Sequence, residues 1–179
     1  MFDTDQLIAD CRAVIGGENA SRHIKDILAR AVSEPASVIA ALGAPTEGGL
    51  VPLYRSPELT ILNVLWQPKM VIMPHNHEQW AVIGVYAGAE DNIMWRRLPG
   101  DAEGRVEAAG ARSLRERDTI AMGEDVVHSV VNPLSRVTAA IHIYGGDFFA
   151  TPRSEWEPDS LIEKPYDMEK VLRLFADRA

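Results

Sequence analysis

Residues 73–88 read MPHNHEQWAVIGVYAG, a run that is rich in residues favouring β-strands. Two of the five histidines of the chain, His75 and His77, lie two positions apart in this run. Side chains at positions i and i+2 of a strand point to the same face, so the spacing predicts that both imidazoles face one way. The pair is then either half of a metal site or two surface histidines on an edge strand.

The pattern of apolar residues changes along the chain. Residues 1–43 repeat apolar side chains at helical spacing, which predicts N-terminal helices. Residues 50–150 hold short β-rich runs between glycine and proline turns, and residues 151–179 read as a loop and a C-terminal helix. The expected strands are Leu59–Trp66, Val71–Pro74, Trp80–Tyr86, Asn92–Leu98, Val106–Leu114, Thr119–Met122, Val126–Val131 and Arg136–Tyr144. This pattern predicts one mainly β domain over residues 1–179, an antiparallel sandwich or barrel.

Composition narrows the class of partner. The chain has 179 residues, 46% of them hydrophobic, and a formal net charge of −8. The negative charge opposes binding to nucleic acids or anionic membranes, which leaves a small molecule as the expected partner. The single cysteine, Cys11, cannot form an internal disulfide, and the residues before it do not show the basic region, apolar core and cleavage site of a secretory leader, so export is not expected. No apolar run approaches the roughly 20 residues of a membrane span. We therefore expect a cytoplasmic protein without a membrane span, and none of these properties specifies an oligomeric state.

A third histidine, His128, lies in the segment GEDVVHSVVN of residues 123–132. There a turn leads into a strand, and Asn132 is placed to begin the next turn. This Gly-x4-His-x3-Asn segment and the earlier His-x-His, with Gly88 eleven residues after His77, resemble the two sequence motifs of the cupin superfamily. The resemblance implies a double-stranded β-helix, or jelly-roll barrel, whose two motifs lie on facing strands and hold one metal ion.

The chain departs from the usual cupin pattern at one ligand. Cupins commonly add a glutamate four or five residues after the second histidine, where this chain has Ala81 and Val82. Glu78 would point to the opposite face of a regular strand. The three histidines then form the expected site, and neutral imidazoles leave the full charge of a dication in place. Such a site should attract a thiolate, an enolate or a carboxylate, and its open positions would admit substrate and dioxygen together.

This ligand set narrows the resemblance to the thiol dioxygenases, the group of cysteine dioxygenase and 3-mercaptopropionate dioxygenase. Trp66 lies nine residues before His75, as a tryptophan does in that group, and Trp80-Ala81 follows the second histidine as in its bacterial branch. The resemblance covers roughly residues 50–153. It implies that the histidines hold Fe(II), that the substrate sulfur binds iron, and that both atoms of O2 end on sulfur as a sulfinate.

The run Ala140-Ile-His142-Ile-Tyr144 places three alternate side chains on one strand face. The thiol dioxygenases have Ser-x-His-x-Tyr here, a hydrogen-bonded relay that reaches the substrate, so the resemblance implies catalytic roles for His142 and Tyr144. Because the serine is replaced by Ala140, His142 must find another partner or a water. The alternative is that His142 and Tyr144 are ordinary core residues of a barrel strand.

Three residues are candidates for binding the substrate. Cysteine dioxygenases use an arginine upstream of the barrel, in the region of Arg55, whereas mercaptopropionate dioxygenases use one nine residues after the relay tyrosine, where this chain has Arg153. A planar guanidinium suits bidentate carboxylate binding, and Arg153 is the preferred anchor; an exposed arginine without a substrate role is the alternative. Gln79 would share the strand face of the first two histidines and donate an amide hydrogen bond in the pocket.

These features together predict a mononuclear non-haem Fe(II) dioxygenase that oxidises a small thiol carboxylate, with the metal held by His75, His77 and His128. Two alternatives stay open. One is oxidative carbon–carbon cleavage of a β-diketone or enolate, which the loss of the relay serine favours. The other is a non-catalytic cupin that senses or stores a metal or small molecule. Nickel, copper or zinc would also be accepted by a neutral-nitrogen site.

Overall fold

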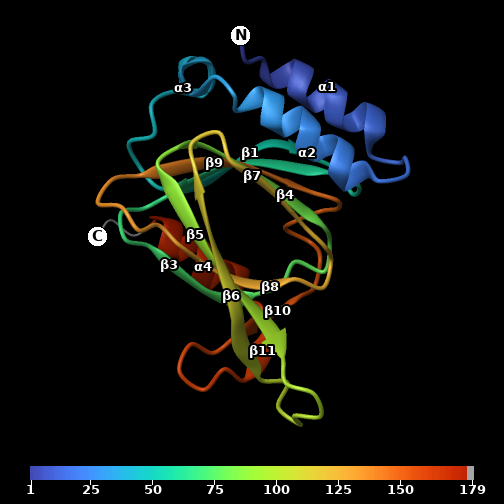
Figure 1. Cartoon of the computed structure of the whole chain (residues 1–179), viewed down its shortest axis with the longest axis vertical. Helices are drawn as coiled ribbons and strands as arrows, with labels where there is room; N and C mark the ends of the chain where they lie inside the picture. The colour runs from blue at the N-terminus through green and yellow to red at the C-terminus, as the bar shows by residue number, and fades with distance from the viewer. Residues whose placement is uncertain (177–179) are drawn as a thin grey trace.

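A computed structural model describes residues 1–176, which form two antiparallel sheets around a common interior (Figure 1). The helices are α1 (Thr4–Val14), α2 (Ala20–Ala31), α3 (Pro35–Leu42) and α4 (Met168–Ala176). The strands are β1 (Gly49–Arg55), β2 (Thr60–Trp66), β3 (Val71–His75), β4 (Ala81–Ala87), β5 (Ala89–Arg97), β6 (Val106–Arg115), β7 (Thr119–Met122), β8 (Val127–Val131), β9 (Thr138–Tyr144), β10 (Ser154–Trp156) and β11 (Glu163–Pro165). The first sheet has the order β1-β2-β9-β4-β7 and the second the order β11-β10-β3-β8-β5-β6. The predicted fold class, a mainly β jelly-roll barrel of the cupin type with helices before and after it, is confirmed.

Strand β9 shows how the barrel divides its side chains between two cores. Ala140 and Tyr144 belong to the core inside the barrel, whereas Ile141 and Ile143 belong to the core under the N-terminal helices. Successive side chains of a strand alternate between its faces, so a strand covered on both sides is apolar along most of its length. This explains why the central strands of the first sheet read as continuous apolar runs.

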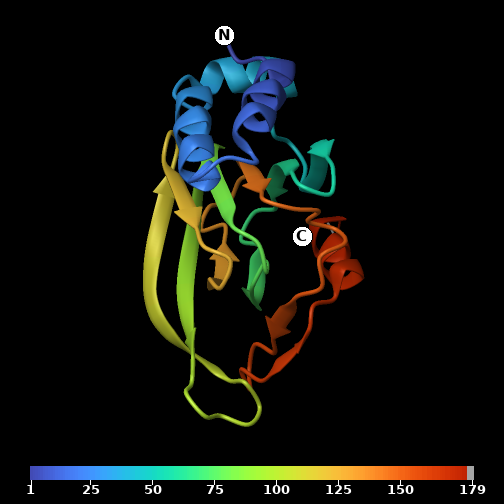
Figure 2. The same ribbon diagram turned by 90° about the vertical axis from the view of Figure 1, so that its right-hand side faces the viewer.

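Helices α1 and α2 cover the outer face of the first sheet (Figures 1 and 2). Leu28 of α2 packs so closely on β4 that a Cβ atom at Gly84 would lie 2.8 Å from the Leu28 side chain. Truncating a fully buried leucine such as Leu28 costs about 2–5 kcal/mol, so this contact is a large part of what fixes α2 to the barrel. None of the helices within residues 1–176 is long and apolar enough to cross a membrane.

The C-terminal segment contributes to the second sheet, although only a loop and a helix were predicted for residues 151–179. Strands β10 and β11 form a short hairpin beside β3. The buried carboxylate of Glu155 in β10 accepts a hydrogen bond from the backbone amide of Asp167 at 3.2 Å and pairs with Lys170 at 3.1 Å. These contacts fix the start of α4 to the sheet. Strands of three residues are too short for a periodic sequence signal, which is why the sequence did not predict them.

Helix α4 forms one wall of the barrel interior. Val171 and Phe175 are 2% and 3% exposed, and the Phe175 ring lies 5.1 Å from the Trp66 ring between centroids. Leu172 of the same helix is 42% exposed. The C-terminal helix therefore lines the space where the candidate site lies.

Strand β1 was also not predicted, because Pro52 interrupts the strand pattern of its sequence. It is an edge strand of the first sheet, and its register with β2 shifts between Pro52 and Tyr54. Proline is tolerated at an edge because one side of the strand has no ladder hydrogen bonds to make.

Candidate metal centre

Three histidines converge inside the barrel where β3 and β8 lie side by side. His75 ends β3 and pairs with His128 of β8 in the antiparallel register. One ring nitrogen from each of His75, His77 and His128 lies within 4.8 Å of the others, and all three residues are buried. The structure thus brings together the three side chains that the sequence named as ligands.

His77 does not lie on a strand, which corrects the expectation of a shared strand face. Strand β3 ends two residues earlier, and the loop that follows carries Glu78 in the left-handed region with φ +53°. Asn76 fixes this loop, because its backbone amide donates to the Ser154 carbonyl at 3.1 Å and its side-chain oxygen accepts from the Ser154 amide at 2.8 Å. The loop aims the imidazole of His77 at His128, with 3.4 Å between the two Nε2 atoms.

Hydrogen bonds on the outer nitrogens orient two of the three rings. The Nδ1 atom of His75 lies 2.9 Å from the carbonyl oxygen of Met73, and that of His128 lies 2.7 Å from the side-chain oxygen of Asn92. These oxygens only accept, so each Nδ1 carries the proton and each Nε2 keeps its lone pair. Imidazoles held in this way are typical ligands of divalent first-row metals, and the residues present fit such an ion.

Burial keeps the three rings neutral. It lowers the pKa of His75 to about 4, and burial together with the neighbouring imidazoles lowers the pKa of His77 and His128 well below the ordinary value. Neutral nitrogens are the form that binds a metal, so the site needs no loss of ring protons to do so near neutral pH.

No carboxylate joins the group of metal-ligating side chains found within the described residues. Ala81 and Val82, at the usual glutamate positions, are completely buried on β4. Glu78 is exposed and accepts a hydrogen bond from the side chain of Asn76. The expectation of a site with three neutral ligands agrees with this geometry.

A buried carboxylate that the sequence did not point to lies behind the site. Glu90 of β5 is 0% exposed and accepts a hydrogen bond from Trp66 Nε1 at 2.9 Å and from Asn92 Nδ2 at 3.0 Å. Its Oε2 atom lies 3.2 Å from His142 Nε2, and His142 Nδ1 lies 3.1 Å from the hydroxyl of Tyr144. Glu90 is therefore the partner that His142 needed in place of the relay serine.

Glu90 was not predicted as a site residue because the expected strand began at Asn92, which left the acid outside it. Strand β5 begins at Ala89, so Glu90 is a strand residue. A glutamate between two apolar strands was the available signal, since buried acids are nearly always paired.

Two members of this network, Glu90 and Tyr144, have a defined protonation state. Burial by itself would raise the pKa of Glu90, but the electrostatic attraction of the His142 imidazole and hydrogen bonds from His142, Asn92 and Trp66 hold it below the usual value. Burial raises the pKa of Tyr144, so this residue is a neutral phenol at ordinary pH. The network therefore contains one anion, Glu90, and one phenol whose proton is available for hydrogen bonding.

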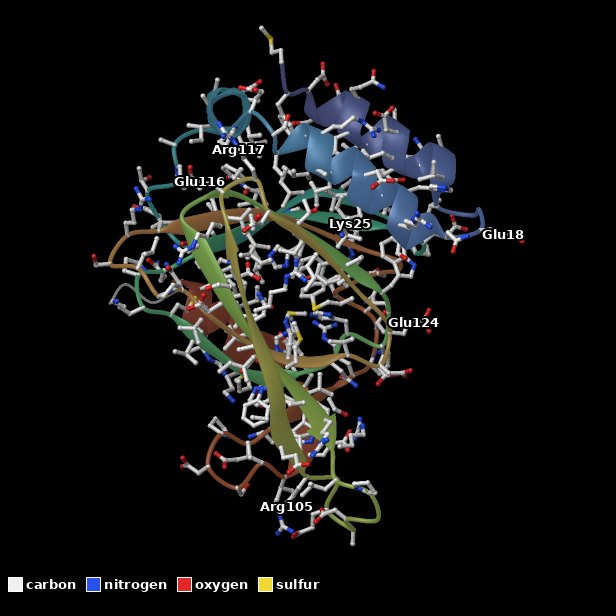
Figure 3. All side chains as sticks on the ribbon, in the orientation of Figure 1. Glu18, Lys25, Arg105, Glu116, Arg117 and Glu124 are labelled. Atoms are coloured by element: carbon white, nitrogen blue, oxygen red, sulfur yellow. The ribbon has the colours of Figure 1, made fainter. Side chains whose placement is uncertain are left out.

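The cavity at the histidines is small and mostly apolar. It has a volume of about 30 Å³, which is room for one or two water molecules. Its lining includes the three histidines, His142, Tyr144, Phe148, Tyr166 and Phe175. Side chains fill the rest of the barrel interior, while labelled charged residues such as Arg105 and Glu124 lie on the outside (Figure 3). His142 and Tyr144 thus both reach the cavity.

Arg153 is buried beside this cavity. It is 8% exposed, and its guanidinium lies between the rings of Phe148 and Tyr166, 4.3 Å and 4.2 Å from their centroids. Its Nη1 atom donates to the carbonyl oxygens of Phe148 and Thr151, whereas Nε and Nη2 are buried without a hydrogen-bond partner. Unpartnered buried donors of this kind are suited to receive an anion.

None of the three candidates for substrate binding lines the cavity itself; Arg153 is separated from it by Phe148 and Tyr166, and Arg55 and Gln79 lie elsewhere. Arg55 is half-exposed and forms a bidentate ion pair with Asp147, at 2.9 Å and 3.0 Å. Gln79 lies in the loop after β3, is 4% exposed, and has no hydrogen-bond partner on either amide atom. A Cβ atom on Gly146 would lie 2.5 Å from the Gln79 oxygen, which places this amide against the chain that follows β9.

The barrel and the three converging histidines define a protein with the cupin fold and a candidate metal centre. No family model matches the sequence. A cupin family protein of the RmlC-like type from Methanocaldococcus jannaschii has 10% identity and a TM-score of 0.47, over 60% of this chain and 86% of that one.

KdgF from Halomonas sp. has 18% identity and a TM-score of 0.41, over 54% of this chain and 76% of that one. Oxalate decarboxylase from Bacillus subtilis, which has Mn(II) centres, has 17% identity and a TM-score of 0.42, over 57% and 26% of the two chains. At these identities the likeness concerns the fold.

Proposed function

We propose that the protein is a mononuclear non-haem Fe(II) dioxygenase that converts a small thiol carboxylate to a sulfinate. The observation that carries the proposal is the convergence of His75, His77 and His128 as neutral, buried imidazoles without a carboxylate. The overall reaction, RSH + O2 → RSO2H, balances without a further reductant. The proposed partners are therefore an anionic small molecule and O2.

The ligand set explains the preference for an anion. When bound, a divalent iron would supply Lewis-acid and redox chemistry and open positions for two ligands. His75, His77 and His128 add no negative charge, so a thiolate would offset the charge of the cation in a buried site. The apolar walls around the histidines exclude bulk water and strengthen that attraction.

Tyr144 and His142 are placed to manage a proton. The Tyr144 ring lies 5.0 Å from the His77 ring, and its hydroxyl lies 3.1 Å from His142 Nδ1. A thiol that binds as a thiolate must release its proton. The phenolic oxygen of Tyr144 can accept that proton while its own passes to His142 Nδ1, where Glu90 stabilises the resulting imidazolium.

Arg153 is the proposed anchor for the substrate carboxylate. Its Nε and Nη2 atoms form one edge of a guanidinium and are buried without partners, which matches the two oxygens of a carboxylate. Arg55 is the weaker candidate because Asp147 already occupies its guanidinium. Gln79 keeps a supporting role as an unpartnered amide near the chain that carries the anchor.

The test is anaerobic loading with Fe(II), followed by 3-mercaptopropionate, cysteine or cysteamine in the presence of O2. We expect equal consumption of O2 and thiol, with sulfinate identified by mass spectrometry. His128→Ala should lose bound iron and activity, whereas His23→Ala, on an exposed part of α2, should keep both. Full iron occupancy without turnover of any of the three thiols would remove the thiol assignment.

A second candidate is cleavage of a carbon–carbon bond in a β-diketone or enolate. The mostly apolar cavity wall formed by Phe148, Tyr166 and Phe175 favours it, since such a substrate has a single charged end. Acetylacetone in the same oxygen assay separates the two candidates. Metal binding without turnover of either class would favour a metal-binding or sensing role.

A further inference from the structure

Glu90 is the point where hydrogen bonds from three separate strands meet. Its Oε2 atom lies 2.9 Å from Trp66 Nε1 and 3.2 Å from His142 Nε2, and its Oε1 atom lies 3.0 Å from Asn92 Nδ2. The side chain is completely buried, so these three groups decide how the carboxylate is used. The indole of Trp66 can only donate a hydrogen bond, which makes Oε2 an acceptor.

We propose that Glu90 is a positioning residue that sets the tautomers of two histidines at once, His142 and the metal ligand His128. The inference rests on the metal site of the proposed function and does not depend on the reaction assigned to it.

The path from Glu90 to His128 runs through Asn92. An ionised carboxylate only accepts hydrogen bonds, so Asn92 must present its NH2 group to Glu90. The side-chain oxygen of Asn92 then faces His128 Nδ1 at 2.7 Å and requires a proton on that atom. The Nε2 atom of His128 is left with its lone pair, 3.4 Å from His77 Nε2.

The path from Glu90 to His142 is direct. The carboxylate requires a proton on His142 Nε2, so Nδ1 of the neutral ring is an acceptor. The hydroxyl of Tyr144 lies 3.1 Å from that Nδ1 atom and donates to it. The phenolic oxygen of Tyr144 therefore keeps its lone pairs for the cavity.

A glutamine at position 90 would disturb the path to His128 in a defined way and leave an acceptor opposite His142. Its amide oxygen must stay opposite Trp66 and His142, because Trp66 has no acceptor. Its NH2 group then faces the NH2 group of Asn92, and two donors cannot bond to each other. Rotation of the Asn92 amide removes the clash but presents NH2 to His128, which moves the His128 proton to Nε2, the metal-binding atom.

The test uses Glu90→Gln, Asn92→Asp and the double variant, which exchanges the carboxylate of residue 90 with the amide of residue 92. Glu90→Gln should lower the affinity for Zn²⁺ about 10–100-fold, measured by competition with a chelator. Adding Asn92→Asp to this variant supplies a carboxylate that accepts from both the new amide and His128. The double variant has the net charge of the wild type and should recover most of the lost affinity. Asn92→Asp alone puts a second carboxylate beside Glu90 and should bind Zn²⁺ less tightly than the double variant while lowering the unfolding midpoint.

A matched control removes a buried hydrogen bond on the opposite face of the first sheet. The hydroxyl of Tyr86 donates to Asn63 Oδ1 at 2.8 Å, and Tyr86 packs in the core under the N-terminal helices. Tyr86→Phe should lower stability without changing Zn²⁺ affinity or the state of any histidine.

Nitrogen-15 NMR of histidine-labelled protein without metal reads the tautomers directly. The expected result is a proton on Nδ1 of His128 and on Nε2 of His142, with the His128 proton moving to Nε2 in Glu90→Gln. A proton on His128 Nε2 in the wild type, an unchanged His128 in Glu90→Gln, or a double variant that binds Zn²⁺ no better than the single one would overturn the proposal.

Failure of the Glu90→Gln variant to fold and failure of the wild type to bind Zn²⁺ have different consequences. If Glu90→Gln does not fold, the wild-type tautomers decide the question. If the wild type binds no Zn²⁺, the metal site of the proposed function fails, while the tautomers of the metal-free protein still test the role of Glu90.

Discussion

The Nε2 atoms of His77 and His128 lie 3.4 Å apart, although 51 residues separate them in the chain. Asn92 holds the His128 proton on Nδ1, so a hydrogen bond between these two atoms in the metal-free protein has His77 Nε2 as its donor. A cation would replace that hydrogen bond and take a lone pair from each of the three rings once the His77 proton moves to Nδ1. The buried cluster of three histidines is therefore best able to bind a metal at a pH where all three rings are neutral.

Acid should destabilise the metal-free protein. The pKa of His75 is about 4 in the folded state and about 6.5 when exposed, so only the unfolded state takes up this proton between those values. Stability is therefore complete above about pH 6.5 and falls as the pH decreases toward 4, by about 2 kcal/mol at pH 5 from His75 alone. Urea unfolding at several pH values measures this. His75→Asn, which cannot titrate here, should show a flatter dependence, and an equal slope in both proteins would contradict the prediction.

Phe175→Ala should open the cavity from the side of α4. The Phe175 ring is 3% exposed and contacts Trp66, so its loss should cost about 3–5 kcal/mol of unfolding free energy. The extra space should raise kcat/KM for thiols bulkier than 3-mercaptopropionate relative to that substrate. Leu172→Ala, at an exposed position of the same helix, serves as the control. An unchanged preference for substrate size, in a variant that remains folded, would show that Phe175 does not limit the cavity.

Arg153→Lys should raise KM for a thiol carboxylate about 10–100-fold, because lysine keeps the charge but loses the bidentate geometry. Cysteamine has no carboxylate and should be affected much less. Arg55→Lys, whose partner is Asp147, should leave both KM values unchanged. Steady-state oxygen consumption of the wild type and of the two variants measures these KM values. Equal effects of Arg153→Lys on cysteamine and 3-mercaptopropionate would point to a packing role for the arginine.

Cys11 should resist thiol reagents in the folded protein. It is 0% exposed in the core under the helices, and burial raises its pKa to about 12. The folded state holds this proton more tightly than the unfolded state, so its contribution to stability is complete below about pH 9 and is lost as the pH rises above it. Labelling rates measured against urea concentration should follow global unfolding. Rapid labelling under native conditions would show that α1 opens locally.

The sequence predicted much of the barrel because local pattern and tertiary environment agree there. Strand β9 is predicted by its apolar run, and its alternation already placed His142 and Tyr144 on one face. The prediction from sequence failed where the tertiary structure overrides a local rule. Pro52 interrupts the strand pattern of β1, which is nevertheless an edge strand, and His77 reaches the site from a loop that Asn76 joins to Ser154 by hydrogen bonds.

The sequence by itself determined the mainly β fold class and named the three histidines that the structure brings together, since both depend on spacing within short segments. Only the tertiary structure revealed Glu90, whose partners Trp66 and His142 are 24 and 52 residues away. It alone also placed α4 as a cavity wall, because an amphipathic helix shows which face is buried but not against what. Hydrogen bonds between distant strands depend on sheet order and register, and neither is encoded in the period of any single strand.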